Sequence, residues 1–245
     1  MSEVRKLGRF SFVLQGADKE LTDQLSALFP QSGEDNGAPN IVQLTDGDVR
    51  TVVNQALRYH DGCLWIDAAA LISPNGKKVL IAGASHSGKS TSTVALALIR
   101  NWKVLSEDIT LFDPLTDKLL SFASPFSLKP GTADRLRANA CIPPRLFMNE
   151  WISMEGMMAE GEQSPQLDLA FAFRHLADPS APGSLELGEL SPTEFVHCLL
   201  PISNLLHVNG LADKMVSYLS RSRCFALGGG SITERLDLIE SLTRA

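Results

Sequence analysis

The sequence predicts an α/β protein, with a core over residues 61–245 and a small mixed α+β region over residues 1–60. Three observations support this fold class. Apolar runs of strand length alternate with stretches of helical periodicity along the core. One of these strands leads through a glycine-containing loop directly into a helix. The chain has 245 residues, 44% of them hydrophobic and 20% charged, and is therefore long enough to bury one sizeable core.

The first 60 residues are expected to form two short strands and two helices. Residues 9–14 alternate like an edge strand, and residues 41–44 form a second apolar run of strand length. Leucines at helical spacing predict a helix over residues 17–29, and a second helix is expected over residues 49–59. The stretch 30–40 is rich in Gly, Pro, Ser and Asn, which is typical of an exposed loop.

The first half of the core begins with residues 64–72, whose apolar run fits either a helix or a strand. The tripeptide Pro74-Asn75-Gly76 then predicts a turn. We expect strands at 79–82, 102–106, 109–112 and 118–122 and a helix over 89–100. The last two strands flank a short turn and predict a hairpin.

The second half of the core is expected to be built as follows: a strand at 167–173, a loop at 179–190, a helix starting after Ser191, a helix at 211–220, a strand at 224–227 and a helix at 233–243. Ser191, Pro192 and Glu194 have the order that favours the start of a helix. The three glycines at 228–230 predict a flexible turn, with an anion site as the weaker alternative.

The most informative motif is the phosphate-binding loop pattern G-x-x-x-x-G-K-[ST] at residues 83–90. The predicted strand before it and helix after it would aim backbone N–H groups and the positive end of a helix dipole at one point. A polyphosphate is the ligand that needs such a concentration of donors, so the candidate nucleotide-binding residues are Gly83, Ala84, Ser85, His86, Ser87, Gly88, Lys89, Ser90 and Thr91.

Side chains within and after this loop indicate phosphoryl-transfer chemistry. Lys89 would place its ammonium on the β- and γ-phosphates, and Ser90 would offer its hydroxyl to Mg²⁺. Glu107 and Asp108 end the next strand, which in a parallel sheet lies beside the loop. One carboxylate can hold Mg²⁺ and the other can accept a proton from an attacking hydroxyl. Lys129 either neutralises phosphate charge or is a surface lysine.

Composition narrows the classes of partner. The formal net charge is −6 and no basic stripe is present, so we expect no nucleic-acid partner. No apolar run approaches the roughly 20 residues that span a bilayer, and no secretory signal is recognisable, so no membrane partner is expected. The cysteines lie far apart, which favours reduced core thiols and a cytoplasmic location; they are Cys63, Cys141, Cys198 and Cys224.

The segments GASHSGKST, WKVLSEDITLF and PFSLKPG together resemble the HPr serine kinase/phosphorylase family, specifically its shorter HPr-kinase-related branch. That branch typically has a phosphate loop, a strand ending in Ser-Asp-Asp and a Pro-x-Ser-Leu-Lys segment. Here these lie at residues 83–91, 106–108 and 125–129. The specific likeness covers residues 65–131.

The resemblance implies a phosphate-loop kinase core shared with phosphoenolpyruvate carboxykinase, and an ATP-dependent kinase acting on a serine hydroxyl of a small protein or peptide. Carried over by position, residues 83–90 bind the nucleotide. Ser90 and Asp108 serve Mg²⁺, and Glu107 stands where the family has the Asp proposed as base. Lys89, Glu107 and Asp108 are thus the candidate catalytic residues. Relatives in the larger family assemble, so a homo-oligomer is one expectation.

Two positions depart from the family pattern. Glu107 replaces an aspartate, and Asp67 stands where the family tends to have a histidine. These departures motivate a second reading, in which the protein is a nucleotide-binding regulatory or scaffold protein, or an ATPase, of the same fold without kinase activity. A GTPase is a weaker choice, because no N-K-x-D pattern for guanine recognition is present.

Overall fold

The structure, a computed structural model, is a mixed α/β fold. It describes residues 4–16, 18–29, 39–44, 49–127, 147–148, 151–153, 156–159, 166–174, 183–207 and 210–245. The chain divides into two compact units: residues 1–62 with 121–156, and residues 63–120 with 157–245. The sequence suggested a single division near residue 60. The structure also divides the chain there, but groups the segment 121–156 with the N-terminal residues.

The first unit contains a three-stranded sheet in the order β1-β2-β3, with β1 antiparallel and β3 parallel to β2. Its elements at the N-terminal end are β1 Arg5–Leu7, β2 Phe10–Gly16, α1 Lys19–Leu28, β3 Asn40–Leu44 and α2 Val49–Tyr59. The predicted strands and helices of this region are confirmed, but the expected edge strand at 9–14 was wrong in its position: β2 lies between β1 and β3, and its first five residues are buried. Strand β1 is an addition. Phe12, Val42 and Val52 form part of its core, because all three are fully buried.

The same unit carries short strands from the later segment: β9 Phe122–Ala123, β10 Phe126–Ser127, β11 Phe147–Met148 and β12 Trp151–Ile152. Strands β10, β12 and β11 form a small antiparallel sheet in that order. Lys129 and most of residues 128–165 lie outside the described residues.

His60, at the end of α2, is buried in the first unit and anchors two backbone segments. Its Nε2 accepts a hydrogen bond from the Arg9 N–H at 2.9 Å, and its Nδ1 lies 2.7 Å from the Ala56 carbonyl oxygen. Because one ring nitrogen must accept and the other must donate, the ring is neutral with its proton on Nδ1. Burial, together with the nearby Arg9 charge, keeps the pKa of His60 below its ordinary value.

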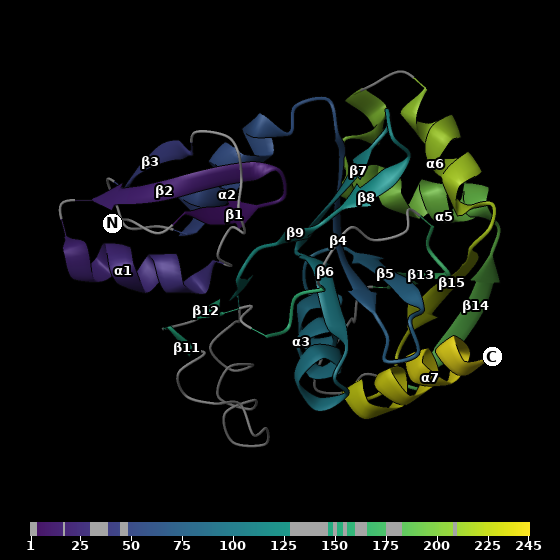
Figure 1. Ribbon diagram of the computed structural model, residues 1–245. Coiled ribbons are helices and arrows are strands. Elements are labelled where there is room, and N and C mark those ends of the chain that lie inside the picture. Colours follow the sequence, from purple (N-terminus) through teal and green to yellow (C-terminus); the bar gives the residue numbers. More distant parts are fainter. Residues whose placement is uncertain are drawn as a thin grey trace. The chain divides into compact units, whose positions relative to one another are not determined.

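The second unit is organised around a twisted mixed sheet with the strand order β14-β15-β13-β5-β4-β6 (Figure 1). Its strands are β4 Leu64–Ile72, β5 Lys78–Gly83, β6 Lys103–Glu107, β7 Ile109–Asp113, β8 Lys118–Leu120, β13 Leu169–Phe173, β14 Glu186–Leu190 and β15 Arg223–Gly228. Strand β7 also pairs with β4 and continues into the predicted hairpin with β8, which is confirmed.

Strands β5, β13 and β15 are parallel, but β4 lies antiparallel between β5 and β6. The sheet is therefore not wholly parallel as expected, and β4 separates the strand ending at Glu107 from the loop strand. The two strands still run in the same direction, since each is antiparallel to β4. Their carboxyl ends consequently reach the same edge of the sheet.

Helices cover both faces of this sheet. They are α3 Lys89–Ile99, α5 Pro192–Leu199, α6 Leu211–Leu219 and α7 Ile232–Arg244, with single 3₁₀ turns at Leu200–Ile202 and Leu205–His207. Alternate residues of β4, from Leu64 to Ala70, pack with Phe195 of α5 and Met215 of α6 in one core. Helix α3 packs on β4, β5 and β6, and α7 runs beside α3 (Figure 1).

Two segments of this unit bear on the sequence predictions: one decides between two alternatives, and the other contradicts a predicted loop. Residues 64–72, left open between helix and strand, form the long strand β4, which is buried on both faces over residues 68–71. The predicted loop at 179–190 was wrong for residues 186–190, which form strand β14 antiparallel to β15. Its Glu-Leu-Gly-Glu-Leu sequence lies at the sheet edge and is largely solvent-accessible, so the apolar pattern of a strand is absent.

Candidate functional site

Residues 83–90 form a tight connection between β5 and α3, with its turn exposed to solvent. The Ser87 N–H donates to the Ala84 carbonyl oxygen at 3.1 Å. His86 and Gly88 both have left-handed backbone angles, with φ of 71° and 90° respectively. Gly88 is the residue that precedes the first turn of α3, and no side chain caps the helix there. Because the first N–H groups of a helix have no partner within the helix, this end of α3 has the donor geometry that anions use.

Gly83 closes the base of this loop, and its lack of a side chain is required by close packing. A Cβ at this position would lie 2.6 Å from the Ser87 hydroxyl oxygen and 3.0 Å from the carbonyl oxygen of Phe173 on β13. The loop therefore folds back directly onto the end of β5 and the neighbouring strand. Larger residues at position 83 would displace the loop backbone.

Lys89 is the first residue of α3, and its ammonium lies at the centre of a group of carboxylates. The side chain is only 6% exposed. Its Nζ donates to the Asp67 carboxylate at 2.5 Å and lies 3.6 Å from the Asp108 carboxylate. Burial lowers the pKa of Lys89, but attraction to Asp67, Asp108 and Glu107 outweighs it and the pKa stands above its ordinary value. Lys89 therefore stays charged at neutral pH.

A β-bulge in β6 sets the direction of the two acidic residues. The pairs Leu71 with Val104 and Ala70 with Ser106 leave Leu105 as one extra residue on β6. The Ser106 hydroxyl then accepts the Ala70 N–H at 3.0 Å, which replaces a regular strand-to-strand hydrogen bond. Bulges of this kind redirect side chains, and they recur beside active sites.

Asp108, between β6 and β7, has a left-handed backbone with φ of 62°. Its carbonyl oxygen accepts the Ala68 N–H at 3.0 Å, so the kink remains hydrogen-bonded to β4. The Asp108 side chain is 65% exposed, whereas that of neighbouring Glu107 is buried. The kink thus presents one carboxylate to solvent and the other to the interior.

Glu107 is only 1% exposed, and its surroundings shift its ionisation strongly. Burial is the main cause that raises the pKa of Glu107 to about 7, and repulsion by Asp108 acts in the same direction. Attraction to Lys89 and a hydrogen bond from the Ser90 hydroxyl oppose this shift. A carboxylate with this pKa exchanges a proton near neutral pH, which is the property required of a general base.

The structure brings the predicted residues of the loop together with Glu107 and Asp108 around Lys89. Ser85 and His86 lie at the exposed turn, while Ser87 is buried. Lys129 lies outside the described residues. Sequence reasoning noted Asp67 only as a departure from the family pattern, and it did not identify its ion pair with Lys89. An ion pair across 22 positions depends on how β4 packs against α3, and no local spacing indicates it.

The donor set of this site fits a magnesium ion that is shared with phosphates. Within the described ranges, no group of three or more His, Cys, Asp or Glu side chains is arranged to hold a metal alone. Mg²⁺ usually takes only one or two protein ligands beside water and phosphate oxygens. Ser90 and a carboxylate from Glu107 or Asp108 supply ligands of that type.

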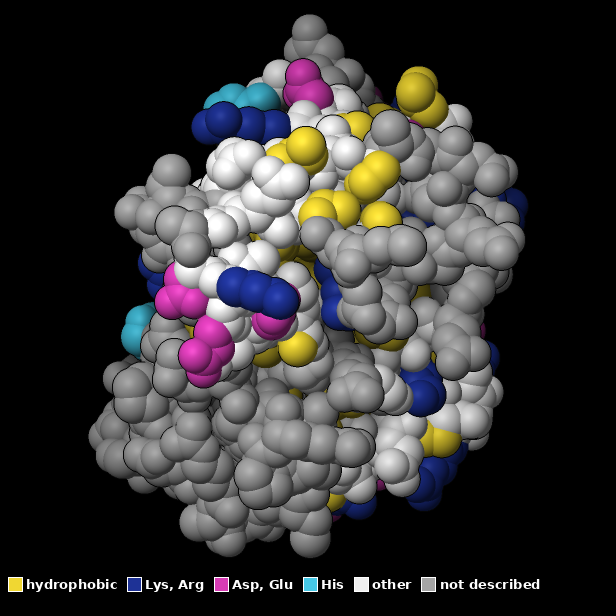
Figure 2. Space-filling view, turned by 60° about the vertical axis from the view of Figure 1, so that its left-hand side comes forward, with side chains coloured by type: hydrophobic (Ala, Val, Ile, Leu, Met, Phe, Trp, Pro, Cys, Tyr) yellow, Lys and Arg dark blue, Asp and Glu magenta, His cyan; other side chains and the backbone are white. Residues whose placement is uncertain are grey.

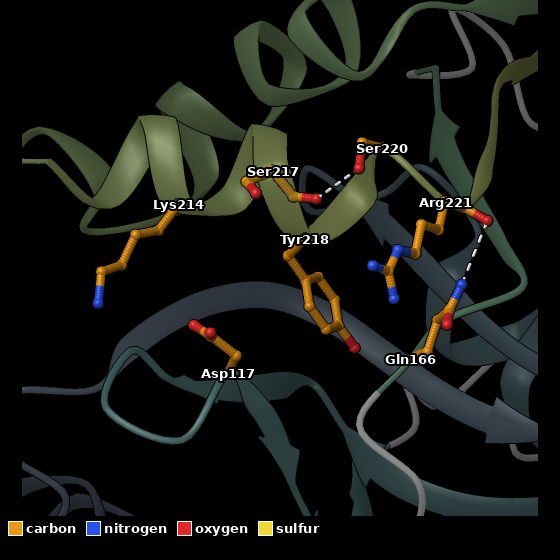
Figure 3. Close-up of a pocket in the computed structure, with 7 residues that line it drawn as sticks. All are labelled: Asp117, Gln166, Lys214, Ser217, Tyr218, Ser220 and Arg221. Carbon is orange, nitrogen blue, oxygen red and sulfur yellow. Dashed lines mark hydrogen bonds between the residues drawn. The ribbon is translucent and has the colours of Figure 1, made fainter.

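Figure 3 shows a separate cavity of about 360 Å³. It lies at the end of the parallel strands opposite to the loop at 83–90. It is lined by Asp117, Gln166, Lys214, Ser217, Tyr218, Ser220 and Arg221. Gln166 and Arg221 come just before β13 and β15, whereas the loop at 83–90 follows the end of β5. The Lys214 ammonium is already bound to the Pro114 carbonyl oxygen at 2.6 Å. This cavity is therefore distinct from the candidate site.

The surface in Figure 2 shows described basic side chains scattered among acidic and apolar ones, with no continuous basic band on that face. None of the helices in the described part of the chain combines the length and apolar character needed to cross a membrane. A scan against protein-family models and a search of curated proteins both find no match to this chain.

Proposed function

We propose that this protein is an ATP-dependent kinase that transfers the γ-phosphate to a serine hydroxyl of a small protein or peptide. The proposal includes a phosphate-loop core like that of HPr kinase and phosphoenolpyruvate carboxykinase. The observation that carries it is the convergence of Lys89, Glu107 and Asp108 at the start of α3, directly beside the glycine-containing loop.

In this proposal the chain's own groups bind and orient the phosphates. Backbone N–H groups of residues 83–90 and the dipole of α3 face the phosphate tail. Lys89 exchanges part of its interaction with Asp67 for phosphate oxygens, so its charge is held in place before the ligand arrives. Bound with the nucleotide, Mg²⁺ would neutralise phosphate charge, with Ser90 and Asp108 as its protein ligands.

Glu107 is proposed as the base that accepts the proton of the acceptor hydroxyl. Its burial and a pKa of about 7 support that role, because a base works best when its pKa is near the operating pH. The hydrogen bond from Ser90 supports the reverse assignment, with Glu107 beside the metal and the exposed Asp108 as base. Magnesium titrations of Glu107→Gln and Asp108→Asn separate the two assignments, since loss of the metal ligand raises the Mg²⁺ concentration required, whereas loss of the base lowers the rate at saturating Mg²⁺.

Transfer from γ-labelled ATP to candidate peptides tests the kinase proposal. We expect label on a serine hydroxyl, and a loss of at least about a hundredfold in Lys89→Ala, because this lysine compensates charge in the transition state. Lys103→Ala, which changes an exposed lysine on β6, is the matched control and should transfer normally. Label that moves only to water would contradict the kinase and leave an ATPase.

A nucleotide-binding regulatory protein of the same fold is the second candidate. The ion pair of Lys89 with Asp67 favours it, because the Asp67 carboxylate competes with the γ-phosphate for the ammonium that transfer would use. Tight ATP binding without turnover, unchanged by Glu107→Asp, would support this candidate. A cytoplasmic location, the absence of nucleic-acid and membrane partners, and homo-oligomer formation remain predictions from the sequence.

A further inference from the structure

Arg235 in helix α7 reaches across to the candidate loop, although 148 residues separate it from Ser87 in the sequence. Its Nη1 donates to the Ser87 carbonyl oxygen at 3.0 Å, and its Nε donates to the Gly229 carbonyl oxygen at 2.6 Å. The guanidinium carbon lies 5.4 Å from the centre of the Phe173 ring. These contacts fix the guanidinium against the outer side of the loop.

The charge of Arg235 is buried without a balancing carboxylate. The side chain is only 2% exposed, and no ion pair to it exists among the residues that the structure describes. Its Nη2 is also buried and has no hydrogen-bond partner within those residues. A buried charge that lacks a partner is costly. An anion bound in the loop at 83–90 would lie near the buried Arg235 charge and would offset this cost.

The turn before α7 is built to make this contact. Gly229 and Gly230 have left-handed backbones, with φ of 58° and 69°. A Cβ on Gly230 would lie 2.6 Å from the Leu185 side chain, so the turn packs closely against the residue that precedes strand β14. The glycines at 228–230 therefore bring α7 and Arg235 to the loop, and the Gly229 carbonyl itself accepts from Arg235.

We infer that Arg235 is a positioning residue for the phosphate loop: it fixes the backbone at Ser87 and Gly88 and adds positive potential for the phosphate tail. This inference rests on the proposed function, since it requires a phosphate ligand. A Cβ added to Gly88 would lie 3.1 Å from the Arg235 Nη1, which shows how closely the arginine approaches the helix start. Arg235 acts through the loop backbone and is not assigned a contact with the reacting atoms.

Calorimetric titration with Mg-ATP, Mg-ADP and adenosine tests this inference. In Arg235→Met we expect affinity for ATP and for ADP to fall by about tenfold or more, since a hydrogen bond to a charged group is lost. Adenosine binding should not change, because it lacks phosphates. Arg235→Lys keeps the charge but cannot bond both carbonyl oxygens, so we expect an intermediate loss.

Arg223→Met is the matched control, because Arg223 also lies over an aromatic ring, at 5.1 Å from that of Phe225, but belongs to the opposite, amino-terminal end of β15. It should bind both nucleotides normally. If the native protein binds ATP and both Arg235 variants bind it equally well, the inference is overturned and the proposed function stands. If the native protein binds no nucleotide, the proposed function itself fails. Should Arg235→Met not fold, equal affinity in Arg235→Lys would still contradict the inference.

Discussion

Single residues at the candidate site carry charges that folding alone does not favour. Glu107 is buried and has a pKa of about 7. Lys89 is buried among three carboxylates, whereas Arg235 is buried with no carboxylate partner among the described residues. Burial disfavours the charged forms of Glu107 and Arg235, whereas Lys89 keeps its charge through the carboxylates around it. Natural proteins keep such groups mainly where a ligand or a reaction uses them. This concentration at one end of the sheet is the strongest residue-level support for function.

The raised pKa of Glu107 predicts how stability depends on pH. The folded protein takes up a proton at Glu107 more readily than the unfolded chain, so the group favours folding at low pH. As the pH rises from below 4.5 to above 7, the unfolding free energy should fall by roughly 3 kcal/mol through this group. Urea unfolding at pH 5 and pH 8 measures this fall.

Glu107→Gln isolates the effect, because glutamine does not titrate. The native-minus-variant difference in unfolding free energy should therefore change between pH 5 and pH 8. An unchanged difference would show that Glu107 ionises normally. Glu189→Gln, at an exposed edge position of β14, serves as a control for the loss of one negative charge.

At the scale of elements, helices α5 and α7 begin with the same capping box. In each, a serine side chain accepts from the N–H of the third helical residue, and that glutamate bonds back to the serine N–H. Of the two, α7 carries the hydrogen bond from Arg235 to the Ser87 carbonyl oxygen in the loop at 83–90. This pair of helices therefore offers two equivalent caps with different expected consequences.

We predict that Ser191→Ala and Ser231→Ala each lower the unfolding free energy by about 1 kcal/mol. Only Ser231→Ala should also weaken ATP binding, because a loosened α7 start moves Arg235. Thermal unfolding and calorimetry on both variants check this. Equal ATP affinity in the two variants would show that the start of α7 does not affect ATP binding at the loop.

How far the sequence predicts this molecule depends on whether a feature is local. Helix α2 and the capped start of α5 were predicted closely, because periodicity and capping residues are written in adjacent positions. The loop at 83–90 was recognisable for the same reason. Strand β14 was missed because an exposed edge strand lacks an apolar pattern. The antiparallel insertion of β4 was missed because strand order is a property of long-range pairing.

The candidate site was likewise predictable only where its features are local in the sequence. Glu107 and Asp108 were found from their place after a strand, but the bulge that separates their environments depends on pairing with β4. Asp67 and Arg235 reach Lys89 and Ser87 only through tertiary packing. An isolated arginine in a C-terminal helix has no sequence pattern that would distinguish it.

At the scale of the whole molecule, the two units should respond to pH in opposite directions. His60 in the first unit has a lowered pKa, so the unfolded chain binds more protons there. That contribution to stability is complete above pH 6.5 and is lost as the pH falls below it. The raised pKa of Glu107 makes the second unit more stable over the same fall in pH.

Hydrogen exchange measured at pH 7.5 and pH 5.5 by mass spectrometry resolves the two units. After correction for intrinsic exchange rates, protection should decrease at the lower pH in α2 and β2, and should increase in β4 and β6. His60→Gln should weaken the first change, whereas His197→Gln, an exposed position on α5, should not. A parallel change in both units would contradict the assignment.

The contact between Ser87 and Arg235 also orders events during synthesis. A ribosome releases the N-terminal part of a chain first, and early segments begin to fold while the rest is still being made. Strand β5 and helix α3 emerge early, but the arginine that steadies their junction is translated 148 positions later. Nascent chains stalled before that point should therefore capture ATP poorly, and the capacity should appear only once α7 has left the exit tunnel.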